Sequence, residues 1–505
     1  MAPQNVASMP PATEIAAEAP PPTPSSCAGS MRSALALSGA FFLVYAAYAL
    51  IHRGSAHQDA ANHFGYARDG LRSLSLLLDP WGRPLWSAAL CIPAQGGILC
   101  ARVFCALLAA WGLFETWRLA RIVIPHAALL AIPAMGLQFH FFALAGDNMT
   151  EPLFALVFAV AYRKWLEGNF VISLLLASLL PLARPEGFFL GVLWGCFVLA
   201  GALPAKKKLT YPLLLLAGTA AWSLGGLVAD GDILFIKHHW PGNWVPGDVY
   251  GRGRLFHYIF QWPLFTGAAF LIPFLAGLWA FESGRPRIHT VTFAYFFLLH
   301  TILWWKGLFG SIGYLRYFVC IAPLLALFTA EGMRLCAAAL AAWRIPPRVA
   351  YGAIVAGAFA WSAVAYEAQG DVYVFRAFEE SEDLWKGGPA PRIVADSNAR
   401  HSYLPPPYGP FQPPTQDIRT QQRVYSAFPP GTRILWDDRM GGGYYAMGDR
   451  EFEVAGYRIA ARRTIEMGAY RPGWYRGIRG LWKQAWHPQL GWKEEWITIT
   501  VYERL

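Results

Sequence analysis

Seven charged residues beside or inside apolar segments are the residues of this sequence best suited to chemistry. They are Asp59, Arg83, Asp147, Glu151, Arg184, Glu186 and Arg316. A charge at a membrane segment is costly unless it faces a partner, a ligand or a polar cavity. Carboxylates can act as general bases, and guanidinium groups can bind phosphate oxygens through two parallel hydrogen bonds. Because all seven map to one side of the predicted membrane domain, we expect them to form an active site.

The elements that must position these charges are membrane helices. Hydrophobic residues make up 55% of the 505 residues and charged residues only 15%, which predicts a polytopic α-helical membrane protein. A spanning helix needs about 20 apolar residues. Runs that approach this length cover 33–51, 98–116, 122–142, 186–203, 210–229, 262–281, 288–304, 313–331 and 349–366. Two shorter runs, 152–162 and 169–183, bring the expected number of transmembrane helices to about nine to eleven.

The basic residues predict the orientation of these helices. The chain has a formal net charge of +10, and its basic residues are concentrated in short connections such as 118–121, 163–164 and 206–208. Such connections stay on the cytoplasmic side of a membrane. The pattern therefore predicts a protein of the cell (inner) membrane, with a cytoplasmic N-terminus and, because the helix number is odd, a periplasmic C-terminus. The orientation of the protein in the membrane explains the excess of basic residues, so we expect no nucleic-acid partner.

The two ends of the chain differ from its apolar middle. Residues 1–30 are rich in Pro, Ala and Ser, which predicts a disordered cytoplasmic tail before a transmembrane domain at 31–366. Residues 367–505 read as a soluble α/β or mostly β domain on the outer face. Its β-like runs lie at 392–394, 432–436 and 496–501. Its seven tryptophans could stack on sugar rings, but a small core filled by large aromatic side chains is the favoured interpretation.

The first outer loop, at about 52–97, brings an acid and a cation to the membrane surface. Asp59 follows the first helix, where a rigid helix start can present a general base. By itself, Asp59 also fits a helix cap. Arg83 lies next to Pro84 and close to Trp81, a setting that suits a bound phosphate and equally an interfacial anchor.

Asp147 and Glu151 bring two further carboxylates to the same face, directly before an apolar run. Two acids beside a short helix indicate a polar cavity rather than lipid. The same stretch also fits a helix start in which Asp147 or Thr150 is the cap and Pro152 lies in the first turn. The two interpretations are compatible.

Arg184 and Glu186 interrupt another apolar stretch, and Arg316 with Tyr317 lies near the outer end of a late helix. We expect Arg184 and Glu186 to pair with each other or with the acids at 147 and 151. An arginine at the depth of Arg316 requires a partner or an anionic ligand.

In these segments the sequence resembles the GT-C superfamily of polyprenyl-phosphate-dependent membrane glycosyltransferases, in its bacterial mannosyltransferase and arabinosyltransferase-like group. The resemblance covers roughly 33–366 and depends on the order and shared face of several short motifs. The matching features are the acid Asp59, the step Arg83-Pro84-Leu85, the segment 147–154, the step Arg184-Pro185-Glu186-Gly187, and Arg316-Tyr317 followed by Pro323.

The resemblance implies a sugar donor carried on a lipid phosphate, a glycan, glycolipid or protein acceptor, and inversion by direct displacement. It assigns the general base to Asp59 and the donor-phosphate ligand to Arg83. Asp147 and Glu151 are then expected to position the acceptor or the base. Further substrate-binding positions are Arg184, Glu186, Arg316 and Tyr317.

One departure from the family pattern concerns metals. Many relatives place Asp-Glu at the first motif, whereas Ala60 follows Asp59 here. A single carboxylate weakens the case for a metal ion, although His57, Asp59 and His63 could form a trio of ligands. We therefore expect no metal and no other cofactor.

Other functions remain open from the sequence. A transporter or flippase of lipid-linked sugars could use the same charges, but it would be expected to place them near the bilayer midplane. A polymerase or ligase of lipid-linked glycans is a closer enzymatic alternative, and a scaffold protein would make the seven charges dispensable. A second outer loop, at 230–263, is expected to cover the site or anchor at the interface.

Overall fold

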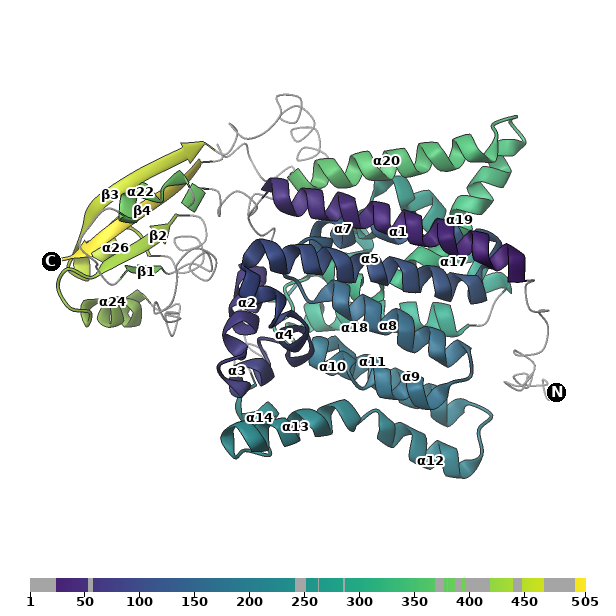
Figure 1. The fold of residues 1–505 in the computed structure, drawn as a ribbon, viewed down its shortest axis with the longest axis horizontal. Helices are drawn as coiled ribbons and strands as arrows, with labels where there is room; N and C mark the ends of the chain where they lie inside the picture. Colours follow the sequence, from purple (N-terminus) through teal and green to yellow (C-terminus); the bar gives the residue numbers. More distant parts are fainter. Residues whose placement is uncertain are drawn as a thin grey trace, which may run out of the picture.

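The computed structural model describes residues 24–52, 58–240, 251–261, 263–284, 287–367, 377–378, 380–386, 393–395, 418–438, 447–466 and 496–505. These residues form a large helical body and a small sheet beyond one end of it (Figure 1). Helix α1 begins at Pro24, inside the segment predicted as a disordered tail, and residues 1–23 lie outside the described part.

The helical body contains both long helices and short segments, with η marking 3₁₀ helices. Its elements are α1 (Pro24–His52), α2 (Gln58–Gly70), α3 (Leu74–Leu78), α4 (Pro84–Leu90), η2 (Pro93–Gly96), α5 (Ile98–Val123), η3 (Pro125–Leu130), α6 (Ala131–Gly136), α7 (Phe139–Ala145), α8 (Glu151–Leu166), α9 (Phe170–Ala177), α10 (Leu180–Ala183), α11 (Glu186–Ala200), α12 (Ala205–Leu214), α13 (Ala217–Asp230), α14 (Phe235–His238), α15 (His257–Phe260), α16 (Pro263–Thr266), η5 (Ala268–Phe270), α17 (Leu271–Gly284), α18 (Ile288–Lys306), η6 (Leu315–Ile321), α19 (Ala322–Ala341) and α20 (Pro347–Glu367).

Several helices have the length and composition of membrane spans. Four described helices qualify alone: Met31–Ile51, Ile98–Val123, Ile288–Lys306 and Leu315–Ala341. The number rises to six if two bent pairs, 125–145 and 205–230, each count as one span. Outward-facing side chains are also apolar, as at Leu43, Val192, Val228, Ile272 and Trp279. Such a surface requires lipid around it, so the protein is a multi-pass membrane protein.

The run predicted as one helix at 122–142 is instead broken, with a bend of 66° between Pro125–Gly136 and Phe139–Ala145. Gln138 stands at the break, and its side-chain amide donates to the carbonyls of Ala134 (3.1 Å) and Ala322 (3.2 Å). The protein itself thus satisfies carbonyl groups at the bend, as backbone at membrane depth requires.

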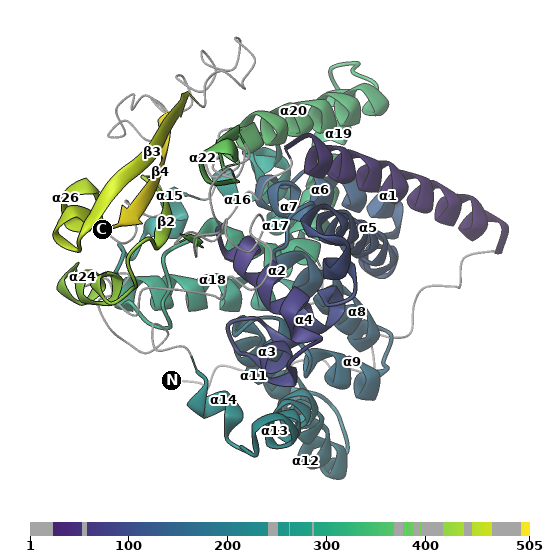
Figure 2. The same cartoon turned by 60° about the vertical axis from the view of Figure 1, so that its left-hand side comes forward.

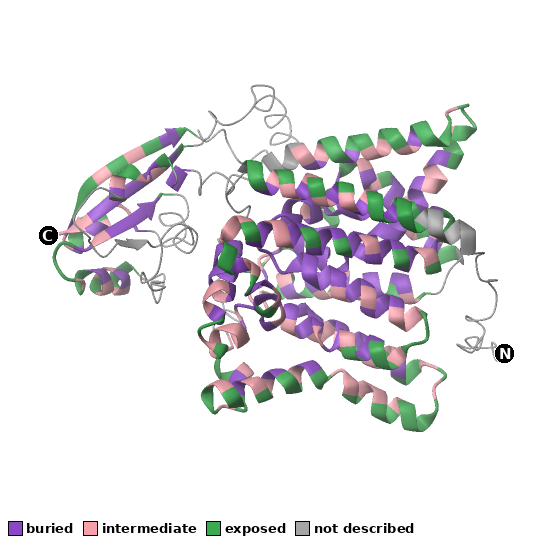
Figure 3. Ribbon diagram, viewed as in Figure 1, coloured by how far each residue is buried: buried purple, intermediate pink, exposed green. Residues whose placement is uncertain are grey.

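Buried residues concentrate between the long helices, whereas α12 and α20 at the periphery are largely exposed (Figure 3). Helices α17 and α19 approach closely through two glycines. A Cβ atom on Gly277 would lie 1.7 Å from the carbonyl oxygen of Phe328, and one on Gly332 would lie 1.6 Å from that of Pro273. Small residues allow this contact between membrane helices. The contact fixes α19 in the body, and with it the preceding η6.

The small domain is a four-stranded sheet with short helices. Its elements are α22 (Asp383–Lys386), β1 (Ile393–Ala395), α24 (Ile418–Ser426), β2 (Arg433–Asp437), α26 (Asp449–Val454), β3 (Tyr457–Glu466) and β4 (Trp496–Arg504). The strand order is β1-β2-β4-β3, with β1 parallel to β2 and the other pairs antiparallel. In Figure 2, α24 and α26 lie on the side of the sheet away from the helical body.

Successive side chains of each strand point to opposite faces of the sheet, and the two faces pack against different neighbours. Ile434 and Trp436 pack with Phe452 of α26, while Leu435 and Val501 belong to the apolar cluster that continues into the helical body. The three predicted strands are confirmed, and the α/β character follows from the helices. Strand β3 was not predicted, because its arginines hide the alternation. Trp436 is buried, which supports the interpretation that this ring fills the core of the domain and does not stack on a sugar.

Candidate active site

Five of the predicted residues form one continuous chain of ion pairs. Asp59 Oδ2 lies 2.5 Å from Arg316 Nη2, and Arg316 Nε lies 3.7 Å from Glu151 Oε1. The same Glu151 oxygen is 2.8 Å from Arg184 Nη1, and Arg184 Nη2 is 2.9 Å from Glu186 Oε1. The expected pairing of Arg184 is therefore confirmed with both Glu186 and Glu151. Segments more than 250 positions apart in sequence meet here.

All three carboxylates of this chain lie in the first turn of a helix. Asp59 is in the first turn of α2, Glu151 in that of α8 and Glu186 in that of α11. Helix N-termini carry a partial positive charge and unpaired backbone N–H groups, so they favour carboxylates. The predicted helix start at 150–152 is also present, with Thr150 as the cap and Pro152 in the first turn. Three helix N-termini thus converge on one polar site.

The arginines occupy less regular positions than the acids. Arg184 is the extended residue between α10 and α11, and Arg316 lies in η6. The break at Arg184 depends on Gly187, where a Cβ atom would lie 2.2 Å from the carbonyl carbon of Leu180. The step Arg-Pro-Glu-Gly therefore turns the chain sharply enough to place Arg184 beside Glu186.

Aromatic rings lie against both guanidinium groups. The Arg184 guanidinium is 5.6 Å from the ring centre of Tyr317, and that of Arg316 is 4.7 Å from the ring centre of Tyr314. Tyr317 in turn stacks on His300 at 4.9 Å. These contacts limit the rotation of the guanidinium planes. Tyr317, predicted as a substrate-binding residue, therefore lies directly at the ion-pair chain.

Arg83 lies in a tightly held loop next to this chain. Asp79 Oδ1 accepts hydrogen bonds from the backbone N–H groups of Trp81 (2.7 Å) and Gly82 (3.1 Å), and Arg83 Nη1 donates to the carbonyl of Pro80 (2.7 Å). Arg83 itself has a φ of +63°, which is uncommon for a residue with a side chain. Such backbone outliers often accompany functional sites.

The electrostatics also connect Arg83 with the ion-pair chain. Burial, aided by the positive charge of Arg184, lowers the pKa of Arg83 to about 9, while Glu186 and Asp59 oppose the shift. The guanidinium is therefore still charged at neutral pH. A buried cation among balanced charges can accept an additional anion.

Asp147 is fully buried in the turn before α8, and its carboxylate accepts a hydrogen bond from the backbone N–H of Asn148 (2.9 Å). Arg102, which the sequence analysis missed, holds this turn in place. It is fully buried in α5 and donates to the carbonyls of Gly146 (2.8 Å) and Ala49 (3.0 Å). A lone arginine inside the apolar run 98–116 was the signal that could have revealed it.

His63 is a second residue of the site that the sequence pattern indicates only as a possible metal ligand. It lies one turn after Asp59 on the same face of α2, is 2% exposed, and meets the ring of Trp81 edge-on at 5.4 Å. His57, another member of the suggested metal trio, lies outside the described residues. Among the described residues, no group of three His, Cys, Asp or Glu side chains could hold a metal ion.

The opposite ends of α5 and α8 carry a different ionic cluster. Arg163 Nη2 lies 3.2 Å from Glu115 Oε2, and it also pairs with Glu167, which Lys164 approaches to 2.7 Å. Because α1, α5 and α8 run through the body, this cluster and the site lie at opposite ends of it (Figure 1). The site residues are thus gathered at one end only.

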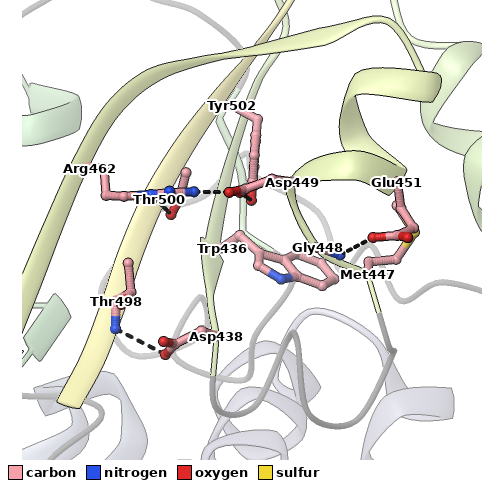
Figure 4. Close-up of a pocket in the computed structure, with 10 residues that line it drawn as sticks. All are labelled: Trp436, Asp438, Met447, Gly448, Asp449, Glu451, Arg462, Thr498, Thr500 and Tyr502. Atoms are coloured by element: carbon pink, nitrogen blue, oxygen red, sulfur yellow. Dashed lines mark hydrogen bonds and ion pairs between the residues drawn. The ribbon is translucent and has the colours of Figure 1, made fainter.

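The small domain contains a separate cavity of about 460 Å³ (Figure 4). Its charged groups are engaged within the domain: Asp449 accepts hydrogen bonds from Arg462 and from Tyr502 (2.6 Å). Asp438 accepts one from the N–H of Thr498 (2.9 Å), and Glu451 one from the N–H of Gly448 (2.9 Å). The Asp449 contacts tie α26 to the sheet, the Asp438 contact joins the end of β2 to β4, and the Glu451 contact closes the start of α26. These contacts account for the three acids without a ligand.

Comparison with protein-family models gives no match, and comparison with curated proteins gives none either. Solved structures do match. ArnT from Cupriavidus metallidurans bound to undecaprenyl phosphate superposes with a TM-score of 0.60 at 11% identity, covering 92% of this chain and 97% of that one. The apo state of ArnT gives 0.57 at 13% identity, covering 79% and 92%. The predicted GT-C-like fold is thereby confirmed.

Proposed function

We propose that this protein is a membrane glycosyltransferase that moves a sugar from a polyprenyl-phosphate donor to an acceptor hydroxyl. The observation that carries the proposal is the buried chain Asp59–Arg316–Glu151–Arg184–Glu186, gathered at one end of a GT-C-like body. The fold it shares with ArnT, which was solved with undecaprenyl phosphate, supports a lipid phosphate as the donor's carrier.

Asp59 is the general base of the proposed reaction. Its side chain is 23% exposed, whereas that of Glu151 is fully buried between two arginines and that of Glu186 is 9% exposed. An acceptor hydroxyl can therefore reach Asp59 most easily. The ion pair with Arg316 at 2.5 Å holds the Asp59 carboxylate in place, and a positioned carboxylate is the kind of group that serves as a general base.

The reaction is an inverting displacement. Asp59 takes the proton of the acceptor hydroxyl while the hydroxyl oxygen bonds to the anomeric carbon. The bond from that carbon to the phosphate oxygen breaks, and the lipid phosphate leaves with the electron pair. Arg83 stabilises the leaving phosphate, as a fixed cation does at developing negative charge. Glu151 and Glu186 hold Arg184 and Arg316 in place, and Asp147 helps to position the acceptor.

The proposal includes the arrangement in the membrane. The catalytic domain comprises residues 31–366 and opens to the periplasmic side of the inner membrane, and residues 367–505 form a domain on that side. The acceptor is a glycan, a glycolipid or a protein. The dense basic connections at the other end of the body, such as 163–164, support this orientation.

The test is transfer of radiolabelled sugar from a panel of polyprenyl-phosphate sugars in membranes that contain the wild type or Asp59→Asn. We expect Asp59→Asn to lower transfer by about 10²- to 10⁴-fold. Asp69→Asn is the matched control. Asp69 lies in the same helix, and its described ion pair is with the adjacent Arg68 at 2.9 Å. Full activity of Asp59→Asn would refute the assignment of the base. Label that crosses the membrane without transfer would favour a flippase.

A further inference from the structure

His63 occupies a place in the site that no step of the proposed reaction uses. It shares the inward face of α2 with Asp59, four positions earlier, because residues four apart lie above one another on a helix. The charges of Arg83, Asp59, Arg184 and Arg316 all act on its imidazole. His63 therefore lies within the electrostatic field of three members of the ion-pair chain and of Arg83.

The surroundings keep His63 uncharged. Burial, followed by the positive charge of Arg83, lowers the pKa of His63 well below its usual range, and Asp59 only partly opposes this. A neutral imidazole carries one N–H donor and one acceptor nitrogen. Among the described residues, the Nδ1 atom has no hydrogen-bond partner although it is buried. A buried polar group without a hydrogen-bond partner costs free energy. This cost indicates that a ligand supplies the missing hydrogen bond.

Trp81 brings His63 and Arg83 together. Its indole meets the His63 ring at 5.4 Å, and the Arg83 guanidinium lies 5.5 Å from the indole centre. Three guanidinium groups and one carboxylate act on this position, and the excess of positive charge favours an anion over a neutral hydroxyl. A neutral imidazole adds a hydrogen-bond donor there without adding another positive charge.

We propose that the Nδ1–H group of His63 donates a hydrogen bond to an oxygen of the lipid phosphate that Arg83 holds. This inference rests on the proposed function, because it assigns a second ligand to the phosphate of the same donor. It makes His63 a binding residue for the leaving group and not a metal ligand.

The test is binding of undecaprenyl phosphate to the purified full-length protein in detergent, with undecaprenol as the probe that lacks the phosphate. We expect His63→Leu to weaken binding of undecaprenyl phosphate by about 10- to 100-fold, because a hydrogen bond to a charged group is lost. Binding of undecaprenol should not change. His126→Asn is the control, since this exposed histidine pairs with Glu331 (2.9 Å).

Two further variants locate the donor atom. The amide nitrogen of asparagine falls near the place of Nδ1, whereas that of glutamine reaches toward Nε2. We therefore expect His63→Asn to bind within a fewfold of the wild type and His63→Gln to resemble His63→Leu. Melting temperatures of all variants establish whether they are folded. If His63→Leu is not folded, the comparison of His63→Asn with His63→Gln provides the test.

The outcomes separate this inference from the proposed function. Equal binding by His63→Leu and the wild type would overturn the inference and leave the glycosyltransferase intact. Better rescue by glutamine than by asparagine would overturn the assignment to Nδ1. A wild type that binds no lipid phosphate and transfers no sugar would overturn the proposed function itself.

Discussion

Asp59 and Glu151 are both carboxylates paired with Arg316, yet their surroundings give them different roles. Asp59 pairs with Arg316 and remains partly exposed, whereas Glu151 lies between Arg184 and Arg316 and is fully buried. A partly exposed acid can meet a substrate, and an enclosed one can only fix its neighbours. Burial thus separates the proposed base from a positioning acid.

Arg316→Lys tests the geometry of the link between the two acids. The planar guanidinium contacts Asp59 through Nη2 and approaches Glu151 through Nε, which a single ammonium group cannot reproduce. We expect kcat for sugar transfer to fall by about tenfold or more. Arg68→Lys, in an ion pair within α2, should retain activity, and equal rates for both variants would contradict the bridging role of Arg316.

Glu151→Gln tests the structural role of the enclosed acid. The substitution removes the charge that two buried arginines share, which costs about 3 kcal/mol for a buried pair. The melting temperature in detergent should therefore fall clearly. Glu167→Gln, at the opposite end of α8 and more exposed, should cost about 1 kcal/mol or less. Similar melting temperatures for the two variants would argue against the enclosed pairing.

At the scale of elements, the site depends on where helices begin and end. The first turns of α2, α8 and α11 supply the acids. The interruptions before α4 and α11 supply Arg83 and Arg184, and the 3₁₀ helix η6 before α19 supplies Arg316. Each interruption brings polar backbone into an apolar body, which membrane proteins tolerate only where it is buried or lines a cavity.

Gly187→Ala tests the break between α10 and α11. The added Cβ atom would clash with the backbone of Leu180 and Pro181, so the turn must open and move Arg184 away from Glu186. We expect at least a tenfold loss of transfer activity together with a lower melting temperature. Gly191→Ala in the same helix is the control, because nothing lies within 4 Å of its added Cβ atom. Normal activity of Gly187→Ala would contradict the close approach.

The link between α26 and β3 predicts a dependence on pH in the small domain. The hydrogen bond from Arg462 holds the pKa of Asp449 below its usual range, although burial partly opposes this. A depressed carboxyl pKa stabilises the fold above the ordinary carboxyl pKa of 3.8, and this contribution is lost as the pH falls through the folded value. The stability of the small domain should therefore depend less on pH in Asp449→Asn than in the wild type. Acid unfolding followed by tryptophan fluorescence measures this difference. Identical acid transitions would exclude this contribution.

At the scale of the whole molecule, the ion-pair chain and the cluster around Arg163 lie at opposite ends of the helical body (Figure 1). The sheet lies beyond the end that holds the site. This separation suits the proposed reaction, whose lipid-linked donor resides in one leaflet.

Cysteine labelling tests the proposed orientation. In a cysteine-free background, Ile92→Cys near the site and Trp343→Cys after α19 place thiols at two exposed positions. We expect a membrane-impermeant maleimide to label Ile92→Cys in spheroplasts, and Trp343→Cys only after permeabilisation. The reverse pattern would place the site on the cytoplasmic side.

The sequence by itself determined the class of the protein and pointed to most residues of the candidate site. Apolar runs longer than a soluble core needs indicate membrane helices. Charges at their ends cost free energy unless they have a partner or a ligand, so they indicate a polar site. The three predicted strands followed from local alternation in the same way. These features depend on the energy of single segments in lipid or water, which composition already fixes.

Only the tertiary structure decided which charges pair, which acid stays accessible, and which residues support them. Arg316 meets Asp59 across more than 250 positions, and Arg102 binds a carbonyl of α1 and one of the turn before α8. The bend at Gln138 and the place of His63 beside Trp81 likewise depend on neighbours distant in sequence. Such contacts arise from the packing of many helices, so no local pattern determines them.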